Sequence, residues 1–160
     1  YGALWTHNTV KTTVLTDTAV VEAAAYDAND CIMAAAESLT GTAATAPFLT
    51  GTITDVIVTD LAGQAANLEL YIFSADPGAV CAAINSDLAI ADDDLAKVQA
   101  IIPITTHFAG ADNSISSATN LNIKYALATG TTMYYALISR GTPTYASVSD
   151  LVISIKVELD

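Results

Sequence analysis

The residues that could do chemistry in this chain are few, and their spacing does not favour a catalytic site. His7 and His107 are its two histidines, and they lie far apart in the sequence. Zinc sites usually place their ligands at short, fixed spacings, so we expect two ordinary histidines at the surface or at a strand edge. No Gly-x-Ser-x-Gly turn singles out a nucleophile among the many Ser, Thr and Asp residues. The sequence therefore predicts no enzyme.

Asp92, Asp93 and Asp94 form a run of acids that could supply oxygen ligands to Ca²⁺. A calcium loop alternates its ligands and carries a turn-forming Gly and a distal Glu, and neither follows here. Acids also suit the start of a helix, where exposed N–H groups and the helix dipole favour negative charge. We expect a helix start here and no metal. The Gly-rich loops that bind phosphates are absent as well, so no cofactor is expected.

Four residues near the C-terminus are the candidate interface or structural positions: Tyr134, Tyr135, Arg140 and Tyr145. Tyrosine is enriched at protein interfaces because it combines a large ring with a polar hydroxyl. The same rings suit a sandwich core, and both roles stay open. Arg140 is one of only five basic residues. We predict that it forms an ion pair, within the fold or across subunits.

Composition excludes several partners. The 160 residues include 17 acids and five bases, for a net charge of −12, and only 14% of them are charged. Without a basic patch, nucleic-acid binding is not expected, nor is binding to an anionic membrane. No apolar run approaches the 18 or so residues of a membrane span. The two cysteines, Cys31 and Cys81, are expected to be small buried thiols, although a disulfide between them stays open.

The C-terminal third of the chain carries the clearest strand pattern. From Leu151 to Leu159 every second residue is apolar, as in a strand with one buried face. The run from Met133 to Ser139 is apolar on both faces, which is typical of a strand inside a sandwich or at a subunit contact. Between them, residues 140–145 form a corner whose Gly141 and Pro143 are turn residues.

The rest of the chain adds short strands and little helix. One or two helical turns are expected within 79–99, and loops over 38–46 and 110–120. Eight or nine strands in one chain without a linker predict a single all-β domain over residues 1–160, an antiparallel β-sandwich or barrel. An extended N-terminal arm over residues 1–16 is a further hypothesis. The remaining strand candidates are 8–16, 18–26, 31–36, 51–61, 67–74, 100–108 and 121–127.

Four stretches stand out together by their order: AYDANDCI (25–32), GTITDVIVTDLAGQAANLELYIFSADP (51–77), LAIADDDLAKV (88–98) and TTMYYALISRGTPTYASVSDLVISI (131–155). Together they resemble the capsid decoration proteins of tailed bacteriophages, a family of small cement or head fibre-like virion proteins. The resemblance runs through residues 73–77, 90–95, 134–135, the 140–145 corner and the final strand at 151–155. The chain departs from the family pattern at Asn29-Asp30, where a Gly-Asp is expected, and the resemblance does not cover the residues before 20.

The resemblance implies a jelly-roll-like β-sandwich, often a homotrimer, that decorates the outer capsid surface of the virion. Its implied partners are the major capsid protein, bound across neighbouring subunits, and further copies of itself. An acidic chain would be repelled by packaged DNA, which agrees with an outer position.

Two other functions stay open. One is a fibre or receptor-recognition β-sandwich that binds host glycans through exposed tyrosines. The other is a non-viral secreted or surface β-domain, or a weak hydrolase that uses His7 or His107.

Overall fold

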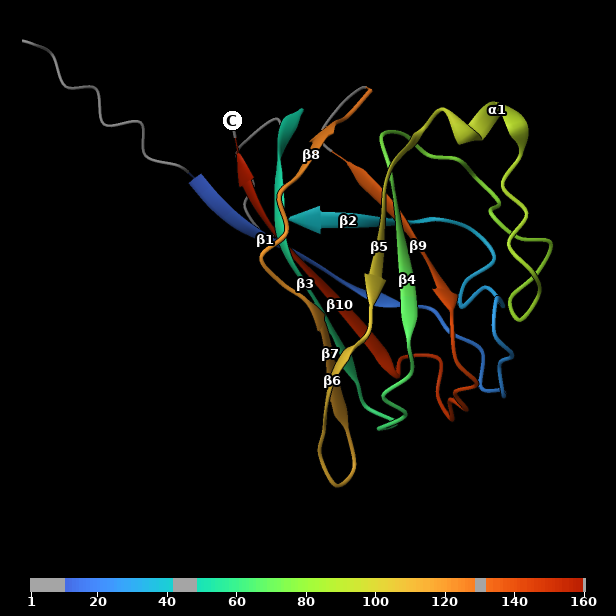
Figure 1. Ribbon diagram of the computed structural model, residues 1–160. Coiled ribbons are helices and arrows are strands. Elements are labelled where there is room, and N and C mark those ends of the chain that lie inside the picture. Colours follow the sequence, from blue (N-terminus) through green and yellow to red (C-terminus); the bar gives the residue numbers. More distant parts are fainter. Residues whose placement is uncertain (1–10, 42–48, 129–131, 160) are drawn as a thin grey trace, which may run out of the picture.

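The computed structural model describes residues 11–41, 49–128 and 132–159 (Figure 1). His7 and residues 1–10 of the predicted arm lie outside this part of the chain. The described residues form ten strands in one continuous hydrogen-bonded order, which divides at β2 into two antiparallel sheets that we call the first and second sheet. The first sheet has the order β1-β10-β3-β7-β6, with β8 beside the start of β3, and the second has the order β2-β9-β4-β5. The strands are β1 (Lys11–Ala19), β2 (Glu37–Gly41), β3 (Thr50–Asp60), β4 (Leu68–Phe73), β5 (Val98–Ile104), β6 (Thr106–Ala109), β7 (Ser114–Ala118), β8 (Ile123–Ala126), β9 (Met133–Ser139) and β10 (Leu151–Leu159).

The strand pairing follows the wrapping pattern of a jelly roll. The first strand pairs with the last, β1 with β10, and the second with the next to last, β2 with β9. Further in, β3 pairs with β7 and β8, and β4 pairs with β5. A long hairpin folded over itself into two sheets gives this order. The predicted all-β, antiparallel, jelly-roll-like sandwich is therefore confirmed.

The alternation of β10 is the main source of the core. Its inward residues Leu151, Ile153, Ile155 and Val157 are fully buried. In the register, Ile155 lies between Leu15 of β1 and Val56 of β3, and these are buried too. Removing such a side chain from water contributes about 1.5 to 3 kcal/mol. β10 thus occupies the centre of the first sheet, as its sequence predicts.

β1 begins at Lys11 and pairs with β10 over its nine residues. Residues 11–16 therefore belong to the sheet and form no free arm. The expected helical turn is α1 (Asp92–Leu95), which carries three acids in its first turn, although none of them makes a side-chain cap hydrogen bond. Across the described residues, no helix is long and apolar enough to cross a membrane.

The strands expected at 18–26 and 31–36 are wrong, since residues 20–36 form isolated bridges at Ala25, Asp30, Cys31 and Ala35 instead of a strand. Two predicted loops, by contrast, contain strands. The loop expected at 38–46 overlaps β2, which pairs with β9 over Glu37–Leu39 and with β1 at Thr40 and Gly41. β2 thus passes from the second sheet to the first. Backbone pairing with β9 and β1 keeps it a strand, although its residues are small and polar. Residues 42–46 lie outside the described part.

The second of these strands, β7, has an inverted alternation. Ser114 and Ser116 point into the molecule and are 1% and 2% exposed, whereas Ile115 points outward and is 45% exposed. The buried serines have polar partners. Ser114 Oγ donates to Asp60 Oδ2 at 3.3 Å, and Ser116 Oγ lies 2.7 Å from Nδ1 of His107. The prediction of a loop over 110–120 is wrong because hydrogen bonds, not apolar burial, fix the inner face of this strand.

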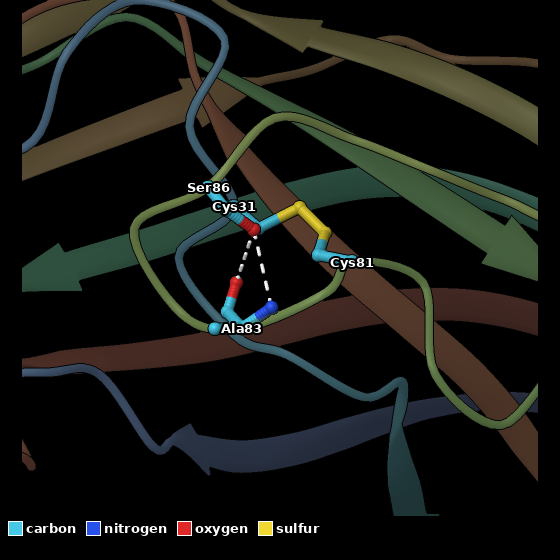
Figure 2. Close-up of a disulfide and its surroundings, with 4 residues drawn as sticks. All are labelled: Cys31, Cys81, Ala83 and Ser86. Atoms are coloured by element: carbon cyan, nitrogen blue, oxygen red, sulfur yellow. Dashed lines mark hydrogen bonds between the residues drawn. A yellow bond between two sulfur atoms is a disulfide. The ribbon is translucent and has the colours of Figure 1, made fainter.

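Cys31 and Cys81 form a disulfide, which corrects the expectation of two free thiols (Figure 2). Both are buried, as expected, and their Cα atoms lie 6.4 Å apart, within the range for disulfides. Residues 81–86 curl around the bond. The Cys31 N–H donates to the Ser86 carbonyl at 2.8 Å, and the Ser86 hydroxyl donates to the Ala83 carbonyl at 2.7 Å. The disulfide therefore ties the segment before β2 to the segment after β4.

Candidate functional site

The predicted interface tyrosines are largely core residues. Tyr135 and Tyr145 are 0% and 2% exposed, and only Tyr134 is half-buried. The ring of Tyr145 packs edge-on against that of Tyr26, with centroids 5.7 Å apart. Burial raises the pKa of the Tyr145 hydroxyl, and the nearby charge of Asp60 acts in the same direction. The two buried rings therefore fill the structural role, and they are not available to stack on a glycan or a partner.

Arg140 forms an ion pair within the fold, as predicted. Its Nη2 contacts Glu69 Oε2, its Nε donates to the same oxygen at 3.2 Å, and its Nη1 donates to Asn29 Oδ1. The hydrogen bond to Glu69 raises the pKa of Arg140 above its usual value. The backbone N–H of Arg140 also donates to the Asn67 carbonyl at 2.8 Å. Through these contacts Arg140 holds the turn at Asn29 against the start of β4.

His107 is held on both sides of its ring. Nε2 lies 2.8 Å from Asn67 Oδ1, and Nδ1 lies 2.7 Å from Ser116 Oγ. Because Asn67 Oδ1 accepts, the Nε2 of a neutral ring carries the proton and Nδ1 accepts from the serine hydroxyl. Neither nitrogen is left for a substrate. Over the part of the chain that the structure describes, no group of three or more His, Cys, Asp or Glu residues is placed to hold a metal ion.

A cluster of titratable groups joins β1, β2 and β9, and no sequence motif points to it. The Tyr135 hydroxyl lies 3.0 Å from Asp17 Oδ2 and 3.1 Å from Glu37 Oε2. A hydroxyl has one proton and can donate to only one of the two carboxylates. If Glu37 is protonated, its carboxyl can donate to the Tyr135 oxygen while the Tyr135 hydroxyl donates to Asp17, so both contacts are hydrogen bonds. Burial raises the pKa of Glu37, the bonds from Val20 and Tyr135 oppose this, and the charge of Asp17 adds to it.

Glu37→Gln is expected to flatten the dependence of stability on pH. A carboxyl whose pKa is raised by folding stabilises the fold fully below its unfolded pKa, about 4.3 for Glu, and this contribution is lost as pH rises through the folded pKa. The free energy of unfolding of the wild type should therefore fall as pH rises above about 4.3. The variant keeps a neutral side chain, so it should lose this decline and be as stable as the wild type, or up to about 1 kcal/mol more stable, at pH 8.

Urea unfolding at several pH values between 4 and 8 measures this effect. Glu22→Gln is the matched control because Glu22 is an exposed glutamate outside the cluster. In Glu22→Gln the free energy of unfolding should fall with pH as steeply as in the wild type. Equal slopes for the wild type and Glu37→Gln would contradict the assignment of the proton to Glu37.

The outer face of the first sheet carries two rows of side chains without a charge. In antiparallel sheets, directly opposed residues share a face, so the register aligns one outward side chain from each strand. We call these ten residues the outer patch. They are Thr18, Val152, Thr59, Ile115 and Phe108 in one row, and Thr16, Ser154, Ile57, Ser117 and Thr106 in the next.

Three apolar residues of the outer patch are exposed to solvent. Phe108 is 75% exposed, Ile115 45% and Ile57 40%. The next row along the strands is charged, with Lys156 Nζ 3.7 Å from Asp55 Oδ2. The second sheet differs, since β4 and β9 are almost entirely buried on both faces. In Figure 1 the loops of residues 20–36 and 74–97 lie on the side of β4 and β9 that faces away from β1 and β10.

No family model matches this chain, and no curated protein matches it in sequence. Among solved structures, it is similar to a chain of infectious bursal disease virus, Gx strain, with 11% identity and a TM-score of 0.39 over 93% of this chain and 33% of that one. It is also similar to the vertex protein P5 of PRD1, with 13% identity and a TM-score of 0.32 over 92% of this chain and 95% of that one. The chain thus spans about a third of the first of these neighbours. At these values the likeness concerns the fold, and the function has to be argued from the residues of the chain itself.

Proposed function

We propose that this chain is a structural virion protein that binds to the outside of a tailed-bacteriophage head, across neighbouring subunits of the major capsid protein. The observation that carries the proposal is the inverted β6–β7 pair. Its inward positions are the polar His107, Ser114 and Ser116, and its outward positions include Phe108 and Ile115. A soluble sheet normally turns its apolar residues inward. The inversion gives the chain an apolar surface suited to a partner.

The phage assignment is supported by the four ordered stretches that resemble capsid decoration proteins. The net charge of −12 supports an outer position, because packaged DNA would repel the chain. Binding across two subunits raises the cost of separating them, by linkage and by multivalent attachment. We propose a binding role without catalysis, since the titratable groups described above make contacts that hold the fold.

Heads prepared without this protein are expected to lose their DNA at lower temperature than complete heads, and added protein should restore the wild-type temperature. The measurement is DNA release during a temperature ramp, with native mass spectrometry of the free protein to test for a homotrimer. Sedimentation of the protein with tails alone, or equal heat resistance with and without it, would contradict the proposal.

A further inference from the structure

We infer that the outer patch is the surface that seats on the partner, that the β6–β7 hairpin is its anchor, and that the partner presents an apolar centre bordered by Lys and Arg. This inference rests on the proposed function in naming the capsid shell as the place where such a partner is found. The predicted tyrosines do not form this surface.

The hairpin presents its apolar pair rigidly. β6 and β7 project from the end of the first sheet (Figure 1), and the Gly110 N–H closes their turn on the Asn113 carbonyl at 2.7 Å. Phe108 and Ile115 are directly opposed across the two strands. On the inward side, His107 is bonded to Ser116, and Ser114 to Asp60. A backbone that is already fixed loses little conformational entropy on binding, which favours affinity.

The outer patch has the size of the centre of an interface. Adjacent strands lie about 4.8 Å apart, so five strands span roughly 19 Å, and the two rows are about 7 Å apart along the strands. A stable interface buries about 800 Å² on each partner, usually as an apolar centre within a polar rim. The rows alone are smaller than that, so a partner that covers them also reaches the groups around them.

Those surrounding groups favour a basic partner over a second copy. Asp112 lies exposed in the hairpin turn, and Glu158 follows Lys156 on the outward side of β10. Lys156 is already paired with Asp55. A second copy would bring a net charge of −12 against −12, whereas Lys and Arg at the edge of a partner would complement these carboxylates.

Phe108→Asp tests the inference with heads of the encoding phage prepared without this protein. The wild type, Phe108→Asp and Leu95→Asp are cosedimented with these heads at about 50 mM and 300 mM salt. Leu95 is the matched control because it is 55% exposed but lies on α1, outside the outer patch. We expect Phe108→Asp to weaken binding at least tenfold and Leu95→Asp to leave it unchanged, and wild-type binding to weaken several-fold at the higher salt. Thermal unfolding of each variant checks that it is folded.

The outcomes separate the two proposals. Undiminished binding by Phe108→Asp would overturn the outer patch as the docking surface and leave the virion role standing. Salt-independent binding by the wild type would overturn the basic rim. Failure of the folded wild type to bind any heads would contradict the proposed function itself. If sedimentation equilibrium instead shows that the free wild type self-associates and that Phe108→Asp abolishes this, the patch is a contact between copies and the inference is wrong.

Discussion

Asp60→Ala is expected to lower the free energy of unfolding by about 3 to 5 kcal/mol. Asp60 ends β3 and is 2% exposed. Its carboxylate accepts from the backbone N–H groups of Ala62, Gln64 and Ala65, at 2.9, 2.8 and 3.1 Å. Removing the acceptor leaves the N–H groups of Ala62 and Gln64 without their partner, at about 1 to 3 kcal/mol for each one that water does not reach. The Ala65 N–H keeps a second acceptor, Ser114 Oγ, at 3.2 Å.

The same carboxylate holds a strained turn. Gly63 and Ala65 have φ angles of 66° and 47°, and the left-handed conformation of Ala65 costs about 1 to 2 kcal/mol. Gln64, within that turn, accepts from the Thr144 N–H at 3.0 Å through its side chain. Loss of Asp60 should therefore loosen both the β3–β4 connection and the corner that contains Tyr145.

Urea unfolding of Asp60→Ala and Asp60→Asn separates these contributions. The amide keeps one acceptor oxygen, so Asp60→Asn should fall between the wild type and the alanine variant. Asp93→Ala is the control, because Asp93 is an exposed acid on α1. A value for Asp60→Ala within about 1 kcal/mol of the wild type would show that water or a rearranged turn replaces the carboxylate.

The strands that could be predicted from the sequence are those that apolar burial holds. β10 and β9 follow this rule, with alternation in one and burial on both faces in the other. β7 does not follow it, because its inward residues are serines that are satisfied by Asp60 and His107. β2 does not follow it either, because its place depends on backbone pairing with two strands that are distant in sequence. Polar burial leaves an alternation that does not say which face points inward, and long-range pairing leaves no periodic signal in a single sequence.

For the candidate site residues, too, some roles could be predicted from the sequence and others could not. The ion pair of Arg140 could be predicted, since a chain with five bases and 17 acids offers an arginine many partners. The burial of Tyr135 and Tyr145 could not, because a tyrosine suits a core and an interface equally well. Phe108 and Ile115 were not singled out. A signal for them existed in the order Ser114-Ile115-Ser116, an alternation whose apolar member faces outward once the strand is placed in the sheet.

Breaking the Cys31–Cys81 disulfide is expected to lower the free energy of unfolding by about 4 kcal/mol. The two cysteines are 50 residues apart in the sequence, and closing a loop of that length removes about this much conformational entropy from the unfolded chain. The native state depends on the bond as well. Between β4 and β5 the regular structure consists of isolated bridges and the four residues of α1, so little sheet pairing holds this segment.

Urea unfolding of the wild type with and without reductant, beside the double variant Cys31→Ala and Cys81→Ala, measures the contribution. The variant should match the reduced wild type, and reductant should not change it further. Hydrogen exchange should quicken first at residues 78–91, because the bridges from Ala79 to Ala35 and from Cys81 to Leu88 lie next to the bond. The strands of the first sheet should keep their protection, since β10 pairs with β1 and β3 without contributions from this segment. Equal stability of the oxidised and reduced protein would contradict the prediction, and would mean that the bridge to Ile138 and the backbone hydrogen bonds of Cys31 to Asn85 and Ser86 hold the two segments together without the disulfide.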